Sequence, residues 1–226
     1  DYRFYITSCY GMHNKMEDRE FLERKFKAVF HRKLNLKNPQ TINEKLQWLK
    51  LYNRNPKYTQ YVDKYLVREY IKETIGEEYL IPLIGVWDNA DDIEFDKLPN
   101  QFVLKCNHNS GTGMYICKNK ENMDCTKVIS ELKKGLKQDY YLTNREWPYK
   151  NVRPRILAEE YMVDEHGDGL KDYKFYCFNG VPKYLYVSQG MNDHKTARVS
   201  FITMNWEKAP FGRADYPEFE ALPSKP

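Results

Sequence analysis

The chain has 226 residues, of which 41% are hydrophobic and 30% charged, as expected of a globular protein with a sizeable core. A formal net charge of +4 is far from the basic stripe of a nucleic-acid binder, so no nucleic-acid partner is expected. The five scattered cysteines, without a Cys-x-x-Cys pair, suggest neither a disulfide framework nor a zinc knuckle. No stretch has the length of a transmembrane helix and no signal peptide is visible, so we expect a cytoplasmic protein.

Residues 1–60 are expected to form a helical N-terminal segment. Signals are weak over 1–16, where we expect irregular chain, and apolar residues at three- and four-residue steps predict a helix over 17–34. Thr41 and Glu44 have the spacing of a capping box and predict the start of the next helix. The apolar side of that helix consists of Leu46, Trp48, Leu49 and Tyr52.

The remaining chain alternates helices with short strands. Asp63 is a suitable N-cap for a helix that ends before Gly76, and another helix is expected over 123–140. Strands are predicted over 80–87, 102–105, 114–116, 156–162, 173–178, 183–187 and 198–204, with a tight Asn179-Gly180 turn between the fifth and sixth of them. This order predicts an α+β fold with at least two subdomains, over 61–158 and 159–226.

The segment from Phe102 to Ile116 reads as a strand, a polar glycine turn and a second strand. Lys105 ends the apolar run and can present its ammonium at the mouth of the turn. The backbone N–H groups of 107–113 can face an anion, which indicates a phosphate site. It is neither a P-loop nor a dinucleotide fingerprint, because the glycines lack those spacings. A plain β-hairpin that binds nothing is the competing interpretation.

Four segments carry a resemblance to a known family. They are NPQTINEK at 38–45, DK followed by VREY within 63–70, LPNQFVLKCNH at 98–108 and DYKFYCFNG at 172–180. In this order the chain, from about Lys33 to its last residue, resembles the ATP-grasp superfamily. Within it the chain is similar to the TupA-like proteins of bacterial surface-polysaccharide and teichuronopeptide gene clusters. The resemblance implies an ATP-grasp fold, in which two α+β subdomains sandwich ATP.

The resemblance also implies roles for individual residues. Lys105 corresponds to the strand lysine that reaches the α- and β-phosphates, and 109–113 to the turn over the triphosphate. Glu159 and Glu160 fall at the hinge that reads the adenine amino edge. The implied ATP-binding residues are Lys64, Lys105, His108, Ser110, Gly111, Gly113, Glu159, Glu160, Tyr161, Met162 and Asp172, and the implied catalytic residues are Lys174 and Arg198. A solvated helix-start lysine remains an alternative for Lys64, and a solvated strand end for Glu159.

The metal site is the main departure from the family's pattern. ATP-grasp enzymes hold Mg²⁺ through late acidic residues, and TupA-like proteins are expected to carry Arg-Val-Asp-Phe-like and Gly-Glu-x-Thr-like segments there. Neither is present before Pro226. The alternatives are an inactive protein and a second subdomain that is truncated in this sequence; we expect the latter and assign no metal ligands.

The expected function is that of an ATP-dependent carboxylate–amine ligase with ATP and Mg²⁺ as cofactors. It would form an amide through an acylphosphate, and the resemblance implies a uronic-acid sugar of a capsule or surface glycan as the carboxylate and an amine as its partner. A kinase acting on a sugar or lipid hydroxyl would use the same ATP residues. A glycosyltransferase is less favoured, because no Asp-x-Asp is present. A non-catalytic binding module is the fourth alternative.

Overall fold

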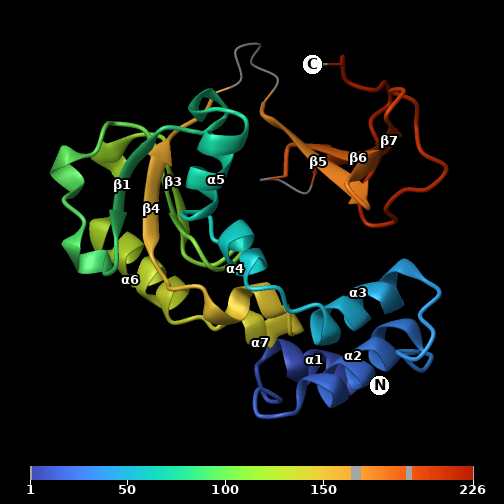
Figure 1. The fold of residues 1–226 in the computed structure, drawn as a ribbon. Coiled ribbons are helices and arrows are strands. Elements are labelled where there is room, and N and C mark those ends of the chain that lie inside the picture. The colour runs from blue at the N-terminus through green and yellow to red at the C-terminus, as the bar shows by residue number, and fades with distance from the viewer. Residues whose placement is uncertain (1, 164–168, 192–194, 226) are drawn as a thin grey trace. The chain divides into compact units, whose positions relative to one another are not determined.

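The computed structural model describes residues 2–163, 169–191 and 195–225 (Figure 1). The chain divides into two compact units, Asp1–Tyr161 and Met162–Pro226, and each is described here by itself. Helices and strands both contribute, so the predicted α+β class is confirmed.

Three helices begin unit 1: α1 (Tyr2–Cys9), α2 (Asp18–Phe30) and α3 (Ile42–Tyr52). The expectation of irregular chain over 1–16 is wrong, because α1 packs Phe4 against Phe21 of α2, with ring centroids 6.0 Å apart. The buried guanidinium of Arg145 then fixes the connection to α2 by donating to the backbone oxygens of His13, Asn14 and Met16. These contacts come from a residue about 130 positions away, which no local pattern reveals.

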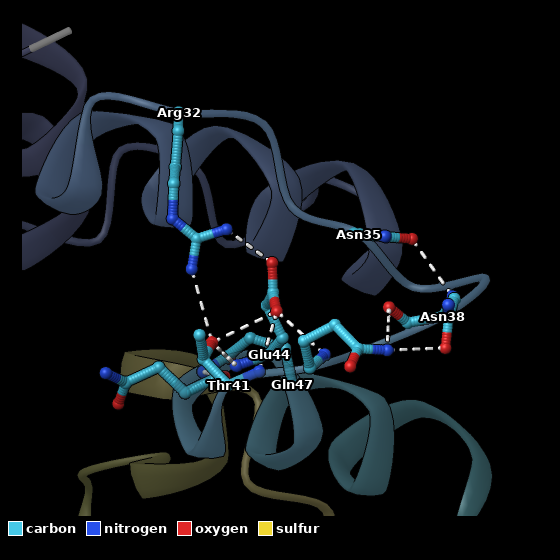
Figure 2. Close-up of polar contacts among 8 residues, drawn as sticks. Arg32, Asn35, Asn38, Thr41, Glu44 and Gln47 are labelled. Carbon is cyan, nitrogen blue, oxygen red and sulfur yellow. Dashed lines mark hydrogen bonds and ion pairs between the residues drawn. The ribbon is translucent and has the colours of Figure 1, made fainter.

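The predicted capping box at the start of α3 is confirmed (Figure 2). The backbone N–H of Glu44 donates to Thr41 Oγ1 at 3.3 Å, and Glu44 Oε2 accepts the N–H of Thr41 at 2.9 Å and of Gln40 at 3.0 Å. Arg32 forms an ion pair with Glu44 Oε1. These donors hold the pKa of Glu44 at about 2, the Thr41 N–H contributing most and Arg32 next. A buried carboxylate therefore anchors α3, whereas its predicted apolar side is largely exposed.

Replacing Glu44 with glutamine is expected to remove an acid-sensitive part of the stability. The folded pKa of about 2 lies below the usual value for glutamate, so the stabilising effect of the charge is complete above the usual value. It is lost as pH falls toward the folded pKa. In urea unfolding experiments, the free energy of unfolding should decline less between neutral and acidic pH for Glu44→Gln than for the parent.

The control for this experiment is Glu20→Gln, which removes an exposed carboxylate paired with Arg24 on α2. Exposed pairs contribute about 0–1 kcal/mol, so the control should follow the parent at every pH. Parallel pH profiles for Glu44→Gln and the parent would contradict the proposed anchoring role.

The central part of unit 1 is a four-stranded antiparallel sheet in the order β1-β4-β2-β3. Its strands are β1 (Leu83–Trp87), β2 (Phe102–Cys106), β3 (Met114–Cys117) and β4 (Ile156–Glu160). The predicted hairpin over 102–116 is confirmed as β2 and β3. One face of the sheet packs through Phe102, Leu104 and Ile156 against Val128 and Leu132 of α6 (Cys125–Leu136).

Short helices surround this sheet: α4 (Lys57–Val62), α5 (Val67–Thr74), α7 (Tyr140–Asn144) and the 3₁₀ turns at 77–79, 90–92, 95–97, 120–122 and 147–151. The helix expected from Asp63 instead begins at Val67, because Asp63 Oδ1 holds the preceding turn by accepting the N–H groups of Tyr65 and Leu66. The helix expected over 123–140 ends early, at Leu136.

Unit 2 is described as a three-stranded antiparallel sheet in the order β5-β6-β7. The strands are β5 (Lys171–Phe178), β6 (Val181–Gln189) and β7 (Arg198–Thr203). The predicted Asn179-Gly180 turn joins β5 to β6, with φ of 51° and 77°. A small core of Leu185, Val187, Ile202 and Phe219 covers one face.

Candidate functional site

A buried carboxylate shared by two cations lies on the sheet face opposite to α6. The register pairs Val103 with Glu159 and Lys105 with Leu157, so Lys105 and Glu159 are diagonal neighbours on one face. Glu159 Oε2 forms an ion pair with Lys105, and Oε1 lies 3.3 Å from Nη1 of Arg68 on α5. Only 6% of the Glu159 side chain is exposed, so it is not a solvated strand end.

Arg68 is a member of this group that the sequence-based site did not include. Its Nη2 also donates to the backbone oxygen of Ile81 at 2.8 Å, which fixes the guanidinium against the chain leading into β1. Glu159 therefore orients Lys105 while Arg68 orients Glu159. The only signal in the sequence was the position of Arg68 within one of the family-like segments, because its partner lies 91 residues away.

Lys64 lies next to the turn of residues 107–113, called the glycine turn below, and binds its backbone. Its Nζ donates to the backbone oxygens of Cys106, Asn107 and Asn109 at 3.4, 3.3 and 2.5 Å. Burial lowers the pKa of Lys64, and the positive charge of Lys105 lowers it further. The alternative of a solvated helix-start lysine is therefore wrong.

Two buried polar residues fix the start of the same turn. Asn107 Nδ2 donates to Asp63 Oδ1 at 2.9 Å and to the backbone oxygen of Arg153 at 2.9 Å. Asn107 Oδ1 accepts the N–H of Arg155 at 2.7 Å. Asp63 and Asn107 are fully buried, so this network positions Lys64 and the turn instead of facing solvent.

The glycine turn divides into a packed part and an open part. His108 is buried with Nε2 3.1 Å from the backbone oxygen of Gln138, and burial lowers its pKa. Gly113 packs against α6, where a Cβ would lie 2.6 Å from Cys106 Sγ and 2.8 Å from Gly135 Cα. Ser110 and Gly111 are exposed, and nothing lies within 4 Å of a Cβ at Gly111. The part able to face a ligand is thus around 110–111.

Two glycine substitutions should separate these parts. Gly113→Ala is expected to destabilise the protein by about 2–4 kcal/mol, from a left-handed φ of 66° and a close contact with helix backbone. Gly111→Ala is the matched control: its φ of 84° costs about 1–2 kcal/mol and no clash adds to it. Urea unfolding of both variants measures the difference, and equal losses would contradict the packing role of Gly113.

A cavity of about 600 Å³ opens beside the group of Lys105, Glu159 and Arg68, between α5 and the start of β1. Its lining includes Tyr65, Arg68, Lys72 and Leu83. The pocket lies within unit 1, and Arg68 connects it to Glu159.

The predicted site residues of unit 2 are divided between two faces of its sheet. Lys174 pairs in register with Tyr186, and its Nζ lies 5.0 Å from the centroid of the Tyr186 ring. It also forms an ion pair with Asp172, and burial lowers the pKa of Lys174. Arg198 pairs in register with Gln189 and donates to the backbone oxygen of Ala197 at 3.0 Å. Because side chains alternate along a strand, Lys174 and Arg198 project from opposite faces. Asp172 and Lys174 are brought together, whereas the two predicted catalytic residues are not.

The hinge residues that follow the buried Glu159 are progressively more open to solvent. Glu160 is exposed and belongs to the other face of β4, Tyr161 is half-buried, and Met162 is 43% exposed. Among the residues that the structure describes, no cluster of three or more His, Cys, Asp or Glu side chains is placed to hold a metal ion. No helix in the described part of the chain is long and apolar enough to span a membrane.

A family model described as TupA-like ATPgrasp matches residues 44–221, well over half of the chain. The chain belongs to this family. Searches of curated proteins and of solved structures found no match. As a TupA-like ATP-grasp protein, the chain is expected to be an ATP-dependent enzyme of the ligase type, and such families generally use ATP and Mg²⁺.

The charged residues beside the glycine turn of this TupA-like ATP-grasp protein carry a positive excess. Lys64, Lys105 and Arg68 place three positive charges around the group, against the two carboxylates of Asp63 and Glu159. The excess of one positive charge, next to the exposed backbone at Ser110 and Gly111, favours an anion. The described residues offer no comparable cluster for Mg²⁺, so no metal ligand is assigned.

Proposed function

We propose that the protein is an ATP-dependent carboxylate–amine ligase acting on a uronic-acid sugar of a capsule or surface glycan. The observation that carries the proposal is the Lys105–Glu159–Arg68 group beside the glycine turn, in a chain of an ATP-grasp family. Preorganised cations next to phosphate oxygens lower the cost of charge that develops during phosphoryl transfer.

The proposed reaction has two steps that balance. A carboxylate oxygen of the sugar attacks the γ-phosphorus of ATP, the bond to the β-phosphate oxygen breaks, and ADP leaves. The amine then attacks the acyl carbon, inorganic phosphate leaves with the bonding electron pair, and the ammonium proton passes to solvent. Mg²⁺, when bound, neutralises the phosphate oxygens.

The residues of this chain have distinct proposed roles. Lys105 binds the α- and β-phosphates, held in place by Glu159. Lys64 supplies positive charge beneath the turn, and the backbone at 110–111 closes over the phosphates. Asp172 is proposed to hold the ribose hydroxyls, and the hinge from Glu160 to Met162 the adenine. Lys174 and Arg198 remain candidate contacts of the transferred group; since they lie on opposite faces, only one is expected to affect turnover.

The test is an assay of the full-length protein with Mg-ATP, a uronate sugar and a panel of amines. The ligase predicts ADP, inorganic phosphate and a product whose mass equals sugar plus amine minus water. A stable phosphoester on the sugar would instead identify a kinase, and it would overturn the ligase while keeping the ATP site. Absence of ADP with every acceptor would overturn both.

A further inference from the structure

Helix α3 displays its apolar residues outward. The α3 apolar face consists of Ile42, Leu46, Trp48, Leu49 and Tyr52, which helical spacing places on one side. Each of these residues is between 38% and 51% exposed. The opposite side carries the buried Glu44, the partly buried Gln47 and Lys50, and Leu51, which packs against the core cluster of Phe4, Phe21 and Leu22. Most apolar residues of α3 therefore face away from the core of unit 1, although the apolar side of a helix usually covers the core.

Polar anchors fix α3 in this orientation. Figure 2 shows Glu44 held by Arg32 and Thr41, and the N–H group of Gln40 also donates to Glu44. At the other end of the helix, Lys50 Nζ donates to the backbone oxygen of Asn144 at 3.1 Å. Rolling α3 to bury its apolar face would break the ion pair and hydrogen bonds of Glu44 and the hydrogen bond of Lys50, so the outward face is a stable feature of the fold.

The segment that carries this face is strongly basic. Residues 1–60 contain thirteen lysines and arginines against six aspartates and glutamates, although the whole chain has a net charge of only +4. Lys45 is exposed and lies within the apolar face, because it is three or four positions from Ile42, Trp48 and Leu49, and its long side chain can carry the ammonium to the rim of the face. The combination of aliphatic, aromatic and basic side chains fits a partner whose outer layer is anionic and whose inner layer is apolar.

A second copy of the chain does not fit this surface. Five half-exposed side chains offer roughly 300–600 Å², whereas a stable interface needs about 800 Å² from each partner. A symmetric contact would also bring two basic segments together. By contrast, Trp48 and Tyr52 form a ring pair 5.1 Å apart, and such aromatic residues are enriched at the boundary between lipid and water.

We propose that the α3 apolar face inserts into the interface of an anionic lipid bilayer. The side chains of Leu46, Trp48 and Leu49 enter the headgroup–acyl boundary, and Lys45 and neighbouring basic residues contact lipid phosphates. The proposal stands on unit 1 alone and does not depend on the ligase activity.

The test is co-sedimentation of the full-length protein with vesicles of phosphatidylglycerol and phosphatidylcholine, compared with phosphatidylcholine alone. We expect at least about tenfold stronger partitioning into the anionic vesicles and weaker binding at higher salt. Brominated lipids should quench tryptophan fluorescence, and Trp48→Phe should remove that quenching.

Leu49→Glu tests the apolar contribution, and Ile75→Glu is the matched control, because Ile75 is 58% exposed and the charge change is the same. Leu49→Glu should reduce partitioning about tenfold or more while Ile75→Glu binds like the parent. Equal binding of the two variants would overturn the proposal, since attraction would then depend on charge alone. A dimer in light scattering that Leu49→Glu dissociates, without vesicle binding, would also overturn it.

Discussion

Lys105→Ala is expected to weaken ATP binding about 10- to 100-fold, because a hydrogen bond between an ammonium and a phosphate contributes about 1.5–3 kcal/mol. Turnover should fall at least as much, since the same charge stabilises the transferring phosphoryl group. Folding should be nearly unaffected: Lys105 is partly exposed, and Glu159 keeps Arg68 as a partner. Calorimetric titration with a non-hydrolysable ATP analogue measures the affinity, and thermal unfolding measures the stability.

Two variants sharpen this experiment. Lys105→Arg keeps the charge but changes its geometry, so it should bind ATP with an intermediate affinity. Lys118→Ala removes an exposed lysine just after β3 and should bind like the parent. If Lys105→Ala bound the analogue as tightly as Lys118→Ala, the phosphate role of Lys105 would be refuted and the glycine turn would be a plain hairpin.

Glu159→Ala is expected to destabilise unit 1 by about 3–5 kcal/mol, because it leaves two cations without their shared counter-ion in a poorly hydrated site. Lys105 and Arg68 are 23% and 16% exposed at the side chain, so water compensates them only in part. Urea unfolding measures the loss. ATP binding should also weaken, since Lys105 loses the contact that orients it.

The neighbouring glutamate is the natural control. Glu160→Ala changes an exposed residue on the other face of β4 and should alter stability by about 0.5 kcal/mol or less. In a double-mutant cycle, the variant with both Glu159→Ala and Lys105→Ala should lose less free energy of unfolding than the sum of the two single losses. If Glu159→Ala were as stable as Glu160→Ala yet lost ATP affinity, Glu159 would act on the nucleotide directly, as the family resemblance implies.

Local features of the sequence predicted much of the fold. Thr41 and Glu44 are three residues apart and satisfy each other's backbone groups, so their capping box could be read without tertiary information. The same holds for the Asn179-Gly180 turn, whose positive φ values suit these residues. Lys105 at the end of an apolar strand before glycines is equally local, and the resemblance built on such segments was confirmed by the family match.

Residues that depend on distant partners were not predictable in this way. The helix α1 was missed because its packing depends on Phe21 and on the buried Arg145. Arg68 was missed because the carboxylate that gives it a role lies on β4. The separation of Lys174 from Arg198 follows from strand register, which is a property of the assembled sheet.

The sequence by itself therefore determined the capping box of α3, the approximate positions of the strands, the glycine turn and the family, because each depends on neighbouring residues or on their order. Only the tertiary structure decided which charges meet. Glu159 becomes the counter-ion of Lys105 and Arg68 because three separate elements converge on it. The apolar side of α3 faces outward because Glu44 and Lys50 are anchored on the inner side by Arg32 and Asn144. At Glu159 a buried charge would otherwise lack its partners, and at α3 the ion pair and hydrogen bonds of Glu44 and Lys50 would be lost if the apolar side turned inward.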